Sequence, residues 1–323
     1  MEFRTVVKPL DGYRGLISHN EPVLMIGSCF TDNIGACLRD DLFDVTVNPF
    51  GPLYNPASVE HAVAILADDC TIEPRDLFMH EGRYHSFFFH SRYSGSDPEE
   101  TARIMTSRIH SAHKSLAGAS ALIVTLGTNR VFRSSCSTFV VANCHKLPAS
   151  EFDEELLSLS QCITSLESIV EISRTVNPDL KVIFTVSPLR YLGQGAHGNT
   201  LAKATLVLAI EDVVSRYDGV HYFPSFEIMM DDLRDYRFYA EDMKHPTDQA
   251  VRYIYENFSA TYFTPETMAL AEKARRVTRR LAHRPMGGRA DNGTDDKNRI
   301  ITDFITALPQ LATNIDRYIS NGI

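Results

Sequence analysis

The sequence predicts an α/β fold in which helices cover both faces of a doubly wound, mostly parallel sheet. Short apolar, β-branched runs, each ending in small or turn-forming residues, alternate with helix-compatible segments. These runs are apolar throughout rather than at every second position, which is typical of strands buried on both faces. The predicted strands are residues 23–28, 121–129, 181–188 and 219–225, and the predicted helices are residues 57–67, 98–116, 152–176 and 200–216.

The ends of the predicted strands are the first places to look for a site, because ligands of such sheets bind beyond the carboxyl ends of the strands. The residues found there are Ser28, 127–129, Ser187 and Pro188. A further segment, residues 77–95, is too aromatic for an ordinary loop and too polar for a core strand. We expect it to form an antiparallel excursion that walls a pocket.

Composition excludes several classes of protein. The chain has 323 residues, of which 44% are hydrophobic and 23% are charged, close to the average for globular proteins. Its 32 basic and 41 acidic residues give a net charge of -9, which argues against a nucleic-acid partner because phosphate binding needs a positive face. No stretch approaches the ~20 apolar residues of a membrane span, and the first residues lack the apolar middle of a signal peptide. We therefore expect a cytoplasmic protein that does not bind membranes.

Cysteine and histidine residues give no pattern of a metal site. The six cysteines form no CxxC pair and no metal-type spacing with histidine, so we expect reduced, mostly buried thiols and no bound metal. His85 and His90 bracket three phenylalanines and, with His80 nearby, are candidates for substrate or metal binding. The alternative interpretation, packing within an aromatic hairpin, is favoured because no carboxylate stands at ligand spacing.

The chain changes character after about residue 265, which divides it into a domain of residues 1–265 and a helical tail of residues 266–323. A Gly-, Asp- and Asn-rich stretch around 285–297 predicts a flexible linker. Beyond it, an amphipathic helix is interrupted at Pro309. Its apolar face must pack either on the body of the chain or on a second copy, which makes a homo-oligomer through the tail one expectation.

Asp242 and His245, in the stretch DMKHP, are three residues apart, a spacing that brings a carboxylate and an imidazole to one side of a turn. An aspartate bound to histidine orients the ring and stabilises it when the ring takes a proton from a serine hydroxyl. A helix cap followed by a surface histidine is the alternative interpretation of the same stretch.

Three groups could supply the other half of such a site. Ser28 lies at a strand-to-helix junction, where unpaired backbone N–H groups point at whatever the hydroxyl attacks. Asn129 could donate its side-chain amide to a developing oxyanion, and Gly51 lets the backbone approach a ligand closely.

These motifs resemble the SGNH hydrolase superfamily and, within it, the GSCFA family, whose name-giving motif stands here at 27–31 with Thr31 in place of the final alanine. The match continues through NPFGPLYNP, HSFFFHSRYS, LGTNRVF, TVSPLR and DMKHP, over roughly residues 20 to 260. The resemblance implies a three-layer α/β/α fold of flavodoxin-like topology, with a Ser28, His245 and Asp242 triad. It also implies an oxyanion hole formed by the N–H groups of Ser28 and Gly51 and the Asn129 side chain.

Cys29 is the alternative nucleophile, since a thiol at a helix N-terminus has a lowered pKa. Ser28 is favoured because adjacent helical residues point in different directions and only one of them faces the histidine. Arg190 could hold an anionic part of the substrate or form a structural ion pair. Tyr54 could line the pocket or shape its loop.

The expected activity is that of a serine esterase that removes an acyl group, acetyl being the first candidate, from an oxygen of a carbohydrate or small metabolite. No cofactor is required for this chemistry. Two alternatives remain open at this point. One is an O-acyltransferase that uses the same triad, and the other is a non-catalytic binding or assembly protein that keeps the fold.

Overall fold

The structure is a computed structural model that describes residues 5–135, 139–282 and 291–320, with backbone alone for 291–296. In this part of the chain the main sheet has five strands in the order β10-β9-β5-β1-β2, and every neighbouring pair is parallel. This order is that of flavodoxin-like sheets. The strands are β1 (Val23–Gly27), β2 (Val45–Val47), β5 (Ala121–Leu126), β9 (Lys181–Val186) and β10 (Val220–Phe223).

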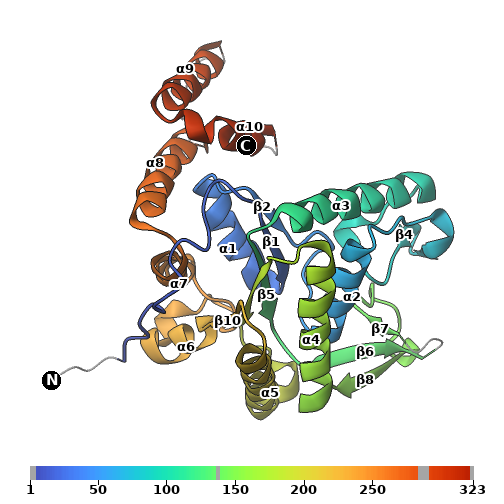
Figure 1. Cartoon of the computed structure of the whole chain (residues 1–323). Helices are drawn as coiled ribbons and strands as arrows, with labels where there is room; N and C mark the ends of the chain where they lie inside the picture. The colour runs from blue at the N-terminus through green and yellow to red at the C-terminus, as the bar shows by residue number, and fades with distance from the viewer. Residues whose placement is uncertain (1–4, 136–138, 283–290, 321–323) are drawn as a thin grey trace.

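Helices cover both faces of this sheet, and alternate strand residues face opposite layers (Figure 1). Leu24 and Ile26 of β1 pack in one core cluster, whereas Val23 and Met25 pack in another. The first cluster includes helices α2 (Pro56–Ala67), α3 (Pro98–Gly118), α4 (Leu159–Val176) and α5 (Gly195–Arg216), and the second includes α1 (Cys29–Asp40) and α7 (Asp248–Tyr262). The predicted three-layer α/β/α fold is confirmed.

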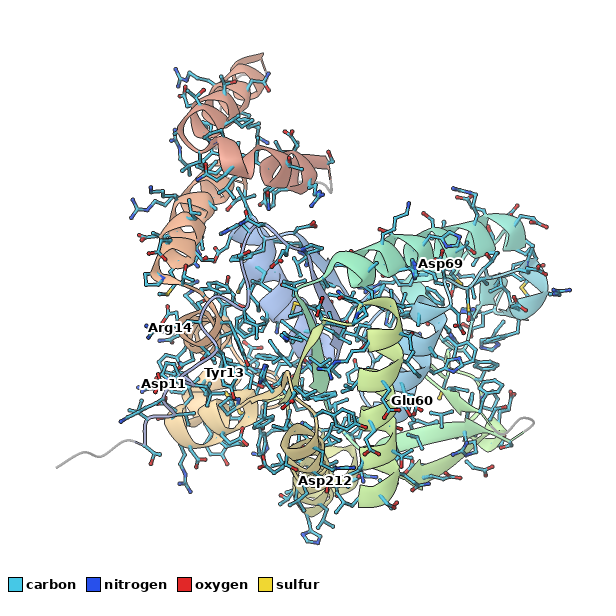
Figure 2. The ribbon with its side chains drawn as sticks, viewed as in Figure 1. Asp11, Tyr13, Arg14, Glu60, Asp69 and Asp212 are labelled. Carbon is cyan, nitrogen blue, oxygen red and sulfur yellow. The ribbon has the colours of Figure 1, made fainter. Side chains whose placement is uncertain are left out.

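Four helices begin at a residue whose side chain caps them. Side chains at the N-caps accept a backbone N–H three residues on, and they are Asn55 for α2, Asp97 for α3, Ser158 for α4 and Thr247 for α7. Such caps satisfy N–H groups that the helix itself leaves unpaired. Between helices, Glu60 of α2 accepts a hydrogen bond at 2.7 Å from Ser165 of α4, and Figure 2 shows Glu60 beside that helix.

The prediction of a helix over 152–176 is wrong in its first part, because Phe152–Leu156 forms strand β8 and α4 starts only after Ser158. Strand β8 pairs antiparallel with β6 (Arg130–Ser134), which also pairs with β7 (Val140–Val141). Its sequence, FDEEL, does not show the apolar face by which a strand is usually predicted. Its acidic side chains instead form ion pairs with arginines of β6, such as Glu154 with Arg130 at 2.7 Å. The antiparallel excursion expected at 77–95 is confirmed as the hairpin of β3 (Phe78–His80) and β4 (Arg83–His85).

The tail forms helices α8 (Pro265–Ala282), α9 (Asp291–Ala307) and α10 (Ala312–Ser320), and a 3-10 turn starts at Pro309 where the interruption is predicted. The linker expected around 285–297 is wrong in its second part, because α9 begins at Asp291. Its first part, residues 285–290, lies outside the described residues. Apolar residues of the tail pack on Leu42 of the body, and Asn314 Nδ2 donates to the Leu42 carbonyl at 2.9 Å. Self-association through the tail stays a prediction.

In the described ranges, we find no helix that combines the length and the apolar character needed to span a bilayer. The cysteines in those ranges, Cys29, Cys37, Cys70, Cys144 and Cys162, are free thiols, of which Cys162 is fully buried.

Candidate active site

Ser28 lies between β1 and α1, as predicted, at the N-cap position of the helix. Its side chain is 0% exposed, and among the described residues its Oγ has no hydrogen-bond partner. A buried polar group left without a partner lowers the stability of the fold by about 1–3 kcal/mol. Such a group is therefore a candidate for a functional role. Ser28 is therefore the candidate nucleophile at this edge of the sheet.

Gly27 holds Ser28 against the neighbouring strand. Its φ is +154°, and a Cβ at this position would lie 2.3 Å from the carbonyl oxygen of Thr125 in β5. The close approach lets the backbone N–H of Ser28 donate to the same Thr125 oxygen at 3.0 Å. The end of β1 is thus fixed by β5, and the serine hydroxyl is placed at the carboxyl edge.

Asn48 is a site residue that the sequence analysis missed. It is fully buried and adopts a φ of +44°, with its side-chain oxygen accepting the Gly27 N–H at 2.9 Å. Its amide nitrogen donates to Asp32 of α1 at 3.0 Å. Asn48 therefore holds in place both the residue before Ser28 and the first turn of the helix after it. The sequence signal that could have found it is the turn-forming Asn-Pro pair at the start of NPFG.

Asp242 and His245 form the predicted pair. His245 Nδ1 and Asp242 Oδ2 lie 2.5 Å apart, and the other carboxylate oxygen accepts the backbone N–H groups of Lys244 and His245 at 2.9 and 3.0 Å. The backbone and ring hydrogen bonds from His245 lower the pKa of the Asp242 carboxyl well below its ordinary value. The helix-cap part of the alternative interpretation is wrong, because Thr247 caps α7. The surface-histidine part agrees with the structure, since the His245 side chain is 49% exposed.

The turn that carries this pair is joined to the end of β9. Arg190, three residues beyond Ser187 at the carboxyl end of that strand, donates its backbone N–H to the Lys244 carbonyl at 3.1 Å. The pair and Ser28 therefore belong to the same edge of the sheet. Within the described residues no hydrogen bond joins Ser28 Oγ to His245, so contact between them stays a prediction. Catalytic hydrogen bonds are often long without substrate and tighten when substrate binds.

The three predicted oxyanion donors differ in whether a hydrogen is still available for a ligand. The N–H of Ser28 donates to Thr125, and the N–H of Gly51, where φ is +93°, donates to the Asn48 carbonyl at 2.9 Å. Asn129 Nδ2 gives one hydrogen to the Leu157 carbonyl at 2.7 Å. Since an amide nitrogen carries two hydrogens, Asn129 keeps one for a ligand, whereas both predicted backbone donors are occupied within the protein.

Cys29 does not have the lowered pKa that the alternative nucleophile requires. Burial, and then the neighbouring Asp32 carboxylate, raise the pKa of the Cys29 thiol. A protonated thiol is a poor nucleophile. This favours Ser28 over Cys29.

Of the predicted substrate-binding residues, Arg190, Tyr54 and His90 surround this edge. Arg190 forms no ion pair within the described ranges and lines a cavity of about 410 Å³ together with Tyr239. Tyr54 lies next to Gly127 at the end of β5, and its carbonyl accepts the Gly127 N–H at 2.7 Å. Burial raises the pKa of Tyr54 to about 12, so its phenol stays protonated.

His90 and His85 differ in their surroundings. His90 lies against Gly51, where an added Cβ would meet the His90 Cβ at 2.3 Å. His85 is buried in the hairpin, where its Nδ1 lies 2.7 Å from the Ser94 hydroxyl and 3.0 Å from Nδ1 of His145. This position fits the packing interpretation of His85, because its ring nitrogens are taken up inside the protein.

The buried histidine pair predicts acid sensitivity. Burial lowers the pKa of His145 to about 4 and also lowers that of His85. The unfolded chain binds these protons near pH 6.5 and the folded chain does not, so the contribution of the two histidines to stability is constant above about pH 6.5 and falls as the pH drops toward about 4. The loss is at most about 1.4 kcal/mol per pH unit for each histidine.

Urea unfolding of the wild type between pH 8 and pH 4.5 measures this slope. His145→Gln is expected to flatten it, and the exposed His197→Gln serves as the matched control and should leave it as it is. If His145→Gln left the dependence of stability on pH unchanged, His145 would not be the source of the acid sensitivity.

The fold and the site together define an α/β protein with a buried serine and a histidine–aspartate pair at one edge of a parallel sheet. The chain belongs to the GSCFA family, whose model matches residues 22–258. No curated protein matches it.

The solved structures that are similar to the chain include three carbohydrate esterases of low identity. One is a family 3 carbohydrate esterase of Clostridium thermocellum, with a TM-score of 0.37, 8% identity and coverage of 78% of this chain and 98% of that one. A family two carbohydrate esterase from the same organism, in complex with cellohexaose, has a TM-score of 0.39 and 12% identity over 76% of this chain and 64% of that one. An acetyl xylan esterase from the rumen bacterium Butyrivibrio proteoclasticus has a TM-score of 0.39 and 10% identity over the same shares. Because these likenesses are low, the assignment of the chain to a family rests on the family model alone.

Proposed function

We propose that the protein is a serine esterase of the SGNH type, which hydrolyses an acyl ester of a carbohydrate or small metabolite. The observation that carries this proposal is the buried Ser28 hydroxyl, which has no hydrogen-bond partner among the described residues, at the same sheet edge as the Asp242–His245 pair. A hydroxyl with no other partner is available to a base, and a histidine whose Nδ1 is bound to a carboxylate has its Nε2 free to act as that base.

In the proposed reaction, His245 Nε2 takes the Ser28 proton as Oγ attacks the ester carbonyl carbon. The tetrahedral oxyanion collapses, the alcohol leaves with the proton from His245, and the acyl group stays on Ser28. Water, deprotonated by His245, then attacks the acyl-enzyme, the bond from the acyl carbon to Ser28 Oγ breaks, and His245 returns the proton to Oγ as the acid is freed. Asp242, whose pKa is lowered, remains an anion throughout and stabilises the imidazolium.

The proposed oxyanion hole consists of Ser28, Gly51 and Asn129. The free hydrogen of Asn129 is available as the structure stands, whereas the two backbone N–H groups have to leave the carbonyls of Thr125 and Asn48. Each donor of this kind contributes about 2.7–4 kcal/mol to the transition state. A rearrangement at the end of β1 and in the 48–51 turn when substrate binds is thus part of the proposal.

Arg190 and the cavity that it lines are the proposed site for the alcohol part of the ester. The Arg190 guanidinium, which has no ion-pair partner among the described residues, can bind carboxylate or hydroxyl oxygens. Tyr236 and Tyr239 line the same cavity and are candidates to pack on a sugar ring. Acetyl is the first candidate for the acyl group.

The test is hydrolysis of p-nitrophenyl acetate and of acetylated sugars by the purified chain, combined with labelling by a fluorophosphonate probe. We expect turnover of the ester and a probe adduct on the peptide that contains Ser28. Acyl transfer to an added sugar in preference to water would convert the assignment to an O-acyltransferase. A chain that is neither active nor labelled would instead be a non-catalytic binding protein.

A further inference from the structure

Lys203 is a buried lysine that the proposed reaction does not use. It lies on α5 and is 2% exposed, and its Nζ donates to the Ser187 carbonyl at 2.7 Å. Within the described residues its ammonium forms no ion pair with a carboxylate. Lysine is almost never fully buried without a charged partner, because removal of the charge from water is costly.

A second polar residue of α5 lies one helical turn before Lys203. Asn199 is 7% exposed, and its side-chain oxygen accepts the backbone N–H of Tyr191 at 2.9 Å. Residues four apart lie on the same side of a helix, so the donor of Lys203 and the acceptor of Asn199 point the same way. Together they hold residues 187–191 at both ends.

The segment 187–191 also supports the catalytic pair. Within it, the Leu189 N–H donates to Ser187 Oγ at 3.3 Å. The Arg190 N–H donates to the Lys244 carbonyl, the residue just before His245. A shift of 187–191 would therefore move the His245 ring.

We propose that Lys203 and Asn199 form a clamp on α5 that positions His245 through the 187–191 segment. This inference rests on the proposed function. Lys203 is a positioning residue in it, because its hydrogen bond to the Ser187 carbonyl acts on His245 through Arg190 and Lys244. Its charge also acts on the thiol of Cys29, the residue next to Ser28.

The cost of burying Lys203 supports a role of this kind. Burial lowers the pKa of Lys203 to about 7, so the environment disfavours the charge that lysine normally carries. A methionine of similar length would fill the same space with no such cost. What only lysine supplies is the hydrogen bond to Ser187, which an amine donates in its charged and neutral forms alike.

Four variants test the clamp. Lys203→Met and Asn199→Leu remove the donor and the acceptor, whereas Asn199→Asp keeps an acceptor. Lys181→Met is the matched control, because Lys181 is exposed at the amino end of β9, the strand whose carboxyl end is followed by Ser187. The measurements are kcat and KM for p-nitrophenyl acetate, melting temperature, and amide hydrogen exchange of residues 187–191 and 242–245.

We expect Lys203→Met and Asn199→Leu to lower kcat by about 10- to 100-fold with little change in KM, since a small displacement of a catalytic group costs this much. Exchange in both segments should rise together, and Asn199→Asp should recover most of kcat. A folded Lys203→Met protein with wild-type kcat, or with unchanged exchange in both segments, would overturn the clamp.

The exchange measurement separates this inference from the proposed function. If the wild type were inactive, the esterase assignment would fail, and coupled exchange of the two segments would still support the clamp. If the wild type were active and only the coupling were absent, the clamp alone would fail.

Discussion

Ser28→Ala is expected to lower kcat/KM for p-nitrophenyl acetate by at least about 10³-fold, the scale seen when the nucleophile of a triad is removed. The loss should be in kcat, because the hydroxyl forms a bond only as the transition state is reached. The residual rate comes from groups that bind the substrate and the oxyanion. Steady-state kinetics with burst analysis measure both the loss in kcat and the residual rate.

Cys29→Ala is the matched control, since it removes a side chain from the next residue of the same helix start. The raised pKa of the Cys29 thiol predicts a change of less than tenfold. Ser28→Ala should also gain stability, because it deletes a buried hydroxyl without a partner. Equal rates for wild type and Ser28→Ala, or a larger loss in Cys29→Ala, would transfer the nucleophile assignment away from Ser28.

Asp41→Ala is expected to destabilise the folded chain by about 3 kcal/mol, because it leaves two groups without their buried partner. The Asp41 side chain is 0% exposed and binds Arg275 of α8 through both oxygens, at 2.5 and 2.6 Å. The buried Tyr255 hydroxyl donates to it at 2.7 Å. The Arg275 side chain is 30% exposed and regains some water in the variant, so we expect the low end of the range for broken buried pairs.

Glu272→Ala is the control for this prediction, since it also removes a carboxylate from an arginine of α8. Glu272 and Arg276 are exposed and paired at 2.5 Å, and an exposed pair contributes at most about 0.5 kcal/mol. Urea unfolding followed by circular dichroism measures both variants. Similar values for the two would mean that the Asp41 network does not anchor the tail.

Features that depend on residues close together in the chain can be predicted from the sequence. The buried strands are apolar along their whole length, and caps such as Asn55 and Asp97 mark the starts of helices, because these signals act within a few residues. The Asp242–His245 pair could be predicted for the same reason, since three residues of chain suffice to bring the two side chains together.

Tertiary structure alone decided the contacts between distant segments. The partner of the Ser28 N–H lies 97 residues away in β5, and Arg275 reaches Asp41 across 234 residues. Lys203, in a segment expected to be a helix, gave no sign of being buried under Ser187. The physical reason is that hydrogen-bond partners and burial depend on how elements pack, whereas periodicity and capping depend on the local chain, and only the latter is written along the sequence.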